Sequence, residues 1–304
     1  MVKIGVIINT MTFEAREIMN AATKYFPDVK MEVFKNDDMK FDITSDNGLN
    51  ADDADVDVFL QRSLSFSRAN YSSFILENYG YRSICSAECL NITNDKLLTT
   101  QALQKAHIPT PRTFVAFTKE AALDAIHELG YPVILKPIIG SWGRLVALLE
   151  NEKAAVAILE DREELGSFYH KIFYIQDYID KPSRSLHKLR EGEGVARDIR
   201  AFVIGDEVVS AMERYEIEND WRSNMSLGGK AEAIKITPEL EDIAIKAAQA
   251  TKGEIVGIDL METEKTGYVV IEVNGTPQFQ GILKSTGINV PKRIVEYAVS
   301  QAKQ

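Results

Sequence analysis

The chain has few cysteines, no excess of positive charge and no long apolar run, and each shortage argues against a class of protein. Cys85 and Cys89 are the only cysteines, and nothing beside them completes a four-ligand metal site, so we expect reduced thiols. The 35 basic residues are outnumbered by 45 acidic ones, which gives a net charge of -10 and argues against a broad nucleic-acid-binding surface. No apolar stretch approaches the length of a membrane span, and the start, MVKIGVIINT, lacks the features of a cleaved leader. We expect a cytoplasmic protein without nucleic-acid or membrane partners.

Two common nucleotide-binding signatures are also missing. The chain contains neither the Gly-x-Gly-x-x-Gly fingerprint of dinucleotide-binding domains nor the Gly-x-x-x-x-Gly-Lys-Ser/Thr phosphate loop. Its four histidines are scattered and are predicted to be surface or packing residues. No Ser/His/Asp set or nucleophilic cysteine is indicated.

At 304 residues the chain exceeds the usual size of one simple domain. Its first part alternates strand and helix patterns, which predicts an α/β fold with a parallel sheet covered on both faces. We therefore expect a small doubly wound domain over residues 1–92. Two mixed α+β units should follow, over residues 93–174 and 175–304.

Lys136 lies inside the apolar strand VILKP, just ahead of the loop GSWGR. A buried ammonium is costly unless it meets an anion, so the alternative is an edge strand on which Lys136 faces water. Gly140 and Gly143 free backbone amides for close approach to an anion. The segment therefore predicts a nucleotide phosphate site.

The stretches EIVGIDLMET and YVVIEVN, joined by the turn EKTG, predict a β-hairpin. With a side-chain period of two, Glu272 and Asn274 project to the same side of the second strand. The apolar side is expected to consist of Val269, Ile271 and Val273. A turn centred between residues 265 and 266 places Asp259 directly opposite Glu272.

Two facing carboxylates repel each other, so a positive group is expected between them. Asp259, Glu272 and Asn274 offer only hard oxygen ligands, which suit Mg²⁺ completed by water and phosphates. The alternative is a structural network in which these acids pair with lysines or arginines. With the phosphate site and several arginines, the pattern favours phosphoryl-transfer chemistry.

The ordered motifs NDK, VILKPIIGSWGR, FYIQDYI, RDIRAFV, RSN and EVN resemble those of the ATP-grasp superfamily. The similarity covers essentially the whole chain and lies in the branch of amino-acid ligases related to the ribosomal protein S6 glutamate ligase (RimK-like). The stretches KPIIGSWGR, FYIQDYIDKP and STGINVP look most like the LysX/ArgX enzymes of lysine and arginine biosynthesis. These attach α-aminoadipate or glutamate to the C-terminal glutamate of the small acidic carrier protein LysW.

The resemblance implies an ATP-grasp fold after the doubly wound domain, with ATP and Mg²⁺ as cofactors. It implies a carboxylate-amine ligase: ATP phosphorylates a carboxylate to an acylphosphate, and the amine of a free amino acid attacks it. It also implies a homo-oligomer, either a dimer or a tetramer.

The resemblance assigns site residues in five groups. The residues expected to bind the ATP phosphates are Lys96, Lys136, Gly140, Ser141, Trp142, Gly143 and Arg144. Those expected to form the adenine hinge are Gln176, Asp177, Tyr178 and Ile179. Asp259, Glu272 and Asn274 are expected to bind magnesium. The catalytic residues expected to orient the acylphosphate are Arg200, Arg214 and Asn224. The substrate side falls to Arg62, Arg68, Arg222, Ser285 and Thr286. The last two are expected to open the final helix, whose first amides would help to hold a carboxylate.

The chain departs from this pattern in three places. Gln278 stands where LysX-type enzymes tend to have an acid, which leaves the added amino acid open. Residues 185–196 resemble an insertion, and Asp177 replaces the commoner hinge glutamate. Two alternatives remain: a ligase acting on the ribosomal protein S6 tail or on a coenzyme of the F420 or tetrahydromethanopterin type, and a non-catalytic nucleotide-binding protein.

Overall fold

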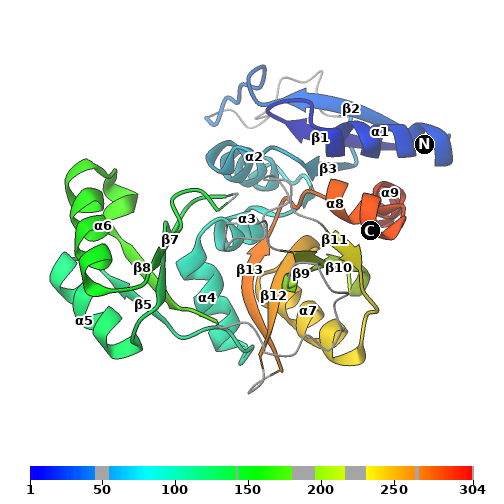
Figure 1. Cartoon of the computed structure of the whole chain (residues 1–304). Coiled ribbons are helices and arrows are strands. Elements are labelled where there is room, and N and C mark those ends of the chain that lie inside the picture. Colours follow the sequence, from blue (N-terminus) through cyan, green and yellow to red (C-terminus); the bar gives the residue numbers. More distant parts are fainter. Residues whose placement is uncertain (45–54, 142, 180–195, 216–230, 264–266, 303–304) are drawn as a thin grey trace.

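A computed structural model describes residues 1–44, 55–141, 143–179, 196–215, 231–263 and 267–302 of the chain. These residues form three sheets, and helices cover each of them (Figure 1). Among the described helices, none combines the length and the apolar character needed to cross a membrane. The α/β class predicted from the sequence is confirmed, with a parallel sheet in the first part of the chain and two further sheets behind it.

The first sheet is parallel throughout, in the order β2-β1-β3-β4. Its elements are β1 (Val2–Ile8), α1 (Phe13–Tyr25), β2 (Val29–Lys35), β3 (Val58–Gln61), α2 (Phe66–Asn78) and β4 (Ser83–Ile84). The Thr12 hydroxyl caps α1 by accepting a hydrogen bond from the Ala15 amide. Because parallel strands send all their carboxyl ends to one edge, the turn from β1 into α1 opens at that edge.

The second sheet is antiparallel, in the order β5-β8-β6-β7. The chain reaches it through α3 (Ala87–Thr93) and α4 (Lys96–Lys105). The sheet and its helices are β5 (Thr113–Ala116), α5 (Lys119–Leu129), β6 (Val133–Lys136), β7 (Ala147–Leu149), α6 (Glu152–Leu165), a 3-10 turn (Phe168–Lys171) and β8 (Phe173–Asp177). Figure 1 shows α5 and α6 on the side of this sheet that faces away from the other two sheets.

The third sheet has the order β11-β10-β9-β12-β13. It comprises β9 (Ala196–Ile204), β10 (Glu207–Tyr215), β11 (Ala231–Ala233), β12 (Ile255–Thr263) and β13 (Gly267–Asn274), with helices α7 (Pro238–Ala250), α8 (Gln280–Thr286) and α9 (Val290–Gln301). Helix α9 returns to pack against α1 (Figure 1). One apolar core therefore joins Ile4 and Ile18 of the first unit to Ile255 and Ile294 near the end of the chain.

The β12–β13 hairpin has the predicted register at its functional end. Asp259 lies directly opposite Glu272. Close to the turn, however, the pairing differs by one residue from the expected count, since Thr263 lies opposite Gly267. A β-bulge between Asp259 and Leu260 accounts for the difference, because it inserts one extra residue of β13 into the pairing.

The same bulge overturns the predicted alternation along β13. Val270 and Val273 are fully buried in the central core, whereas Ile271 is only half-buried. The expectation that Ile271 shares the apolar face is wrong, since a bulge shifts every later side chain by one position. Because the bulge takes up Ile271, Glu272 is the residue that pairs with Asp259.

Candidate active site

A cavity of about 610 Å³ lies where the three units meet. The first unit contributes Phe13 and Glu14 from α1, and the second contributes Gly140, Ser141 and Gly143 from the predicted phosphate loop. The third contributes the ends of β12 and β13 and the segment that follows them. The cavity therefore brings together residues that are distant in the sequence, including those of the predicted phosphate loop and the predicted magnesium site.

All three predicted magnesium ligands line this cavity: Asp259 on β12, and Glu272 and Asn274 on β13. The Nδ2 group of Asn274 donates to the Gly257 carbonyl at 3.4 Å, which leaves its Oδ1 as the amide atom able to contact a cation. Two carboxylates and an amide oxygen on one wall form a hard-oxygen donor set that fits Mg²⁺.

These carboxylates also have cationic neighbours. Asp259 accepts hydrogen bonds from both the Nε and the Nη2 groups of Arg200, the latter at 2.8 Å, and Arg214 Nη2 lies 3.1 Å from its Oδ2 atom. Lys96 Nζ lies 3.4 Å from Glu272 Oε1. The structure thus contains the ion-pair network that the sequence offered as the alternative, in the same place as the magnesium donor set.

The sheet register explains the arginine network. Arg200 lies beside Asp259 across β9 and β12, and Asp198 lies beside Arg214 across β9 and β10. Asp198 accepts two hydrogen bonds from Arg214, at 2.7 and 2.5 Å. Burial alone raises the pKa of Asp259, but Arg200 and Arg214 outweigh it and lower this pKa to about 2. Burial raises the pKa of Asp198, against the opposing effect of Arg214.

Lys136 is buried at the end of β6, and its Nζ group donates to Gln176 Oε1 at 2.5 Å. Since β6 lies between β7 and β8, the alternative of an exposed edge-strand lysine is wrong. Burial lowers the pKa of Lys136 to about 8, although Glu272 opposes the shift. Gln176 is itself fixed by donating to Thr113 Oγ1 and to the Tyr174 hydroxyl, both at 3.1 Å.

Lys96, at the first position of α4, connects two parts of the cavity wall. Its Nζ group donates to the Gly140 carbonyl at 3.0 Å in addition to contacting Glu272. Arg144, beyond the glycines, is exposed and does not line the cavity. Asp177 ends β8, and its amide donates to the Arg112 carbonyl at 2.8 Å. The next two hinge residues, Tyr178 and Ile179, are half-buried.

The predicted substrate residues separate. Arg62 is buried behind the cavity, where its Nη2 group donates to the Pro277 carbonyl at 2.7 Å. Arg68 instead pairs with Asp37 at the surface, away from the cavity. The prediction that Arg62 and Arg68 face one pocket is therefore wrong, since neither side chain lines the cavity. Trp142, Arg222, Asn224 and residues 185–195 lie outside the described residues.

The sequence predicted that Ser285 and Thr286 open the final helix, but they do not. They end α8, whose C-cap is Gly287 with a φ of 70°, and α9 begins only at Val290. Thr286 Oγ1 donates to the Ile282 carbonyl at 2.7 Å. The end of a helix presents carbonyls and a negative dipole end, which disfavour a carboxylate. The predicted anion site at a helix N-terminus is wrong here.

Two charged residues of the cavity wall were missed by the sequence reasoning. Glu14 lies in the first turn of α1, the helix that follows the carboxyl end of β1, and Lys284 lies on α8. The position of Glu14 had a detectable signal, because ligands of open α/β sheets bind at the carboxyl ends of the strands. Lys284 had none, since its place depends on how α8 packs.

Gly275 follows the metal-ligand candidate Asn274 in a close-packed position. A Cβ atom there would collide with the Thr93 hydroxyl and touch Cys89 Sγ, and the Gly275 carbonyl accepts a hydrogen bond from Cys85 at 2.7 Å. Both cysteines are free and buried. The close packing behind the end of β13 fixes where its cavity-facing residues lie.

We expect Gly275→Ala to lower the free energy of unfolding by about 1–3 kcal/mol, because the added methyl overpacks this site. Urea denaturation measures the change. Thr93→Ala removes the colliding hydroxyl, so the double variant should lose less than the sum of the single losses. Strictly additive losses would contradict the steric explanation.

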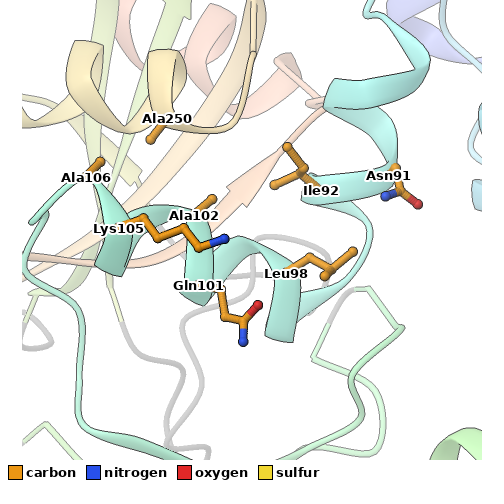
Figure 2. Close-up of a pocket in the computed structure, with 8 residues that line it drawn as sticks. All are labelled: Asn91, Ile92, Leu98, Gln101, Ala102, Lys105, Ala106 and Ala250. Atoms are coloured by element: carbon orange, nitrogen blue, oxygen red, sulfur yellow. The ribbon is translucent and has the colours of Figure 1, made fainter.

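A second cavity, of about 410 Å³, lies between α3, α4 and the end of α7. Figure 2 shows its lining side chains, which include Ile92, Leu98, Ala102 and Lys105. None of the predicted site residues is among them. The candidate active site is therefore assigned to the larger cavity.

The cavity where the three units meet has paired acids and arginines in its wall, and the buried Lys136 and half-buried Lys96 lie close to them. This fold and site define an ATP-grasp protein, so the fold class predicted from the sequence is confirmed. The RimK-like ATP-grasp domain model matches residues 93–298, and the chain belongs to this family. It is 40% identical to the α-aminoadipate–LysW ligase LysX of Saccharolobus solfataricus, over 83% of this chain and 86% of the relative. It is 39% identical to the glutamate–LysW ligase ArgX of Sulfurisphaera tokodaii, over 79% and 81%.

The crystal structure of a RimK domain ATP-grasp protein from Sphaerobacter thermophilus matches with a TM-score of 0.76 and 22% identity, over 98% of this chain and 100% of that chain. At that identity the match supports the fold alone. The family membership and the ligase relatives show that the chain is an ATP-dependent ligase. Ligases of this class use ATP and Mg²⁺.

Proposed function

We propose that the chain joins the amine of glutamate or α-aminoadipate to a glutamate carboxylate of a small acidic carrier protein of the LysW type. The observation that carries the proposal is the similarity, at 39–40% identity over about four fifths of the chain, to two ligases that use this carrier. The ribosomal S6 and coenzyme alternatives have no comparable support.

In the proposed reaction, a carrier carboxylate oxygen attacks the γ-phosphorus of ATP and ADP leaves. The substrate ammonium first loses one proton to solvent. The amine nitrogen then attacks the acylphosphate carbonyl, and the amide forms as phosphate and a second proton leave. Lys96, Lys136 and the amides around Gly140 would hold the nucleotide phosphates. Arg200 and Arg214 would stabilise negative charge on the acylphosphate. Magnesium at Asp259, Glu272 and Asn274 would neutralise phosphate charge.

The proposal covers two amino acids. The relatives that use α-aminoadipate and glutamate are almost equally similar to the chain. Gln278, which departs from the LysX-type pattern, lines the cavity. We propose that this position contributes to the choice between the two amino acids, which differ by one methylene group.

The test incubates the protein with ATP, Mg²⁺, one amino acid and a LysW-type carrier. We expect ADP release and a gain in carrier mass equal to one amino-acid residue. A carrier that lacks its C-terminal glutamate is the matched control and should gain no mass. Ligation to an S6 tail peptide but not to the carrier would contradict the proposed acceptor.

The resemblance also supports a cytoplasmic homodimer or homotetramer as part of the proposal. Light scattering coupled to size-exclusion chromatography measures the mass directly, against 34.0 kDa for one chain. A monomer at assay concentration would overturn this part and leave the reaction unaffected.

A further inference from the structure

Glu14 is a buried carboxylate in the wall of the active-site cavity. It is 4% exposed and lies in the first turn of α1. Within the described part of the chain, its carboxylate forms neither a hydrogen bond nor an ion pair within 4.0 Å. Burying such a group is costly unless a positive partner compensates it.

The other acids of the cavity differ from Glu14 in this respect. Asp259 contacts Arg200 and Arg214, and Glu272 contacts Lys96. Glu14 therefore stands apart as a cavity acid without a cation in contact among the described residues. An incoming cation meets the least competition there.

Arg62 is a buried guanidinium close enough to Glu14 for their charges to interact, although no ion pair joins the two among the described residues. Burial lowers the pKa of Arg62, and the carboxylate of Glu14 opposes that shift, so the two charges act on each other. The Arg62 Nη2 group is nevertheless held by the Pro277 carbonyl at 2.7 Å. The Glu14 carboxylate therefore remains available to the cavity that it lines.

We propose that Glu14 binds the α-ammonium group of the free amino-acid substrate, an assignment that rests on the proposed function. The amine nucleophile enters the cavity as an ammonium, and a desolvated carboxylate is its strongest hydrogen-bonding partner. Lys284, exposed on α8 in the same wall, presents the opposite charge and suits a carboxylate of the same molecule. The two side chains match the two kinds of charge on glutamate and on α-aminoadipate.

A first-turn acid also stabilises the positive end of its helix, so the test must separate that role from substrate binding. A helix-stabilising role predicts a lower melting temperature for Glu14→Gln and unchanged amino-acid affinity. The assigned role predicts that Glu14→Gln loses affinity only for ligands that carry an amino group. Glutarate and adipate, which lack that group, report the difference.

The experiment is calorimetric titration of the full-length protein with L-glutamate, L-α-aminoadipate, glutarate or adipate, each in the presence of ADP and Mg²⁺. We expect Glu14→Gln to raise Kd for the preferred amino acid about 30-fold or more, the size typical of a charge-assisted hydrogen bond. Kd for the matching amine-free diacid and for ADP should stay within about twofold. Glu17→Gln, one turn further along α1 and outside the cavity wall, should bind like the wild type.

Unchanged amino-acid affinity in Glu14→Gln would overturn the assignment, and so would an equal loss of affinity for the amine-free diacid. If Glu14→Gln does not fold, Glu14→Asp keeps the charge and shortens its reach. It should then weaken the amino acid selectively and to a smaller extent, and a non-selective loss would again overturn the assignment. A wild-type protein that binds neither amino acid would overturn the proposed function as well.

Discussion

Asp259→Asn is expected to reduce the rate of amide formation at least about 1,000-fold, because it removes a charge that the reaction needs in two ways. The Asp259 carboxylate belongs to the donor set that fits Mg²⁺. It also positions Arg200, which donates two hydrogen bonds to it. An amide at this position keeps the shape but is a poor ligand for magnesium and a weak partner for a guanidinium.

The same substitution should destabilise the protein. Arg200 would lose its ionic partner, whereas Arg214 would keep Asp198. Leaving one buried charge unpaired costs about 3–5 kcal/mol in known cases. We expect a loss toward the lower end, since Asn still accepts one hydrogen bond. Rates must therefore be measured per folded molecule, with folding followed by circular dichroism.

Asp242→Asn is the matched control for Asp259→Asn. Asp242 pairs with Lys246 on the exposed face of α7, at 2.7 Å, and surface pairs of this kind contribute little. Its ligation rate and melting temperature should match those of the wild type. If Asp259→Asn retained more than a tenth of the wild-type rate, Asp259 would not be a magnesium ligand in the reaction.

The hairpin shows how far sequence reasoning reached, and by what route. Counting outward from the turn correctly placed Asp259 opposite Glu272, yet the strands pair one residue differently near the turn. The β-bulge supplies the missing residue. Bulges depend on strand twist and on packing from both sides, which side-chain periodicity does not report. The strict alternation of side chains therefore gave a wrong prediction at Ile271, the residue at the bulge.

Charges that need a partner were the most predictable part of the site. For the lysine inside an apolar strand, the sequence offered a buried Lys136 near an anion site or an edge-strand lysine facing water, and the structure buries it on a central strand. The roles of Arg68 and of the Ser285–Thr286 segment depended on which elements come together in space. Arg68 pairs with Asp37, and the segment ends α8 instead of starting α9. No local pattern distinguishes these outcomes.

Lys136→Met should separate nucleotide binding from folding stability, with opposite effects on the two. The Lys136 ammonium is buried and contacts a neutral amide, Gln176, at 2.5 Å. Among the described residues it has no full charge in contact, so its burial becomes favourable only when phosphates bind. We expect Kd for ATP to rise about 100-fold in Lys136→Met, because a buried charge-assisted contact to phosphate is lost. Fluorescence titration with a labelled ATP analogue measures this.

The nucleotide-free protein should respond in the other direction. The lowering of the Lys136 pKa from 10.5 to about 8 corresponds to roughly 3 kcal/mol of unfavourable free energy for the buried charge. Methionine has a similar length and no charge, so Lys136→Met should raise the free energy of unfolding by about 1–3 kcal/mol at pH 7. Lys153→Met, on the exposed start of α6, is the control and should change neither quantity.

The pH dependence tests the cause of this stabilisation. Below pH 8 the lysine is protonated in both the folded and the unfolded chain, so the full cost of burying its charge is present. Between about pH 8 and 10.5 the unfolded chain holds more protons, and wild-type stability therefore rises relative to Lys136→Met. The stability advantage of the variant should shrink across this window in urea denaturation without nucleotide. An advantage that stayed constant from pH 7 to pH 10 would show that packing of the methionine, and not the buried charge, produces it.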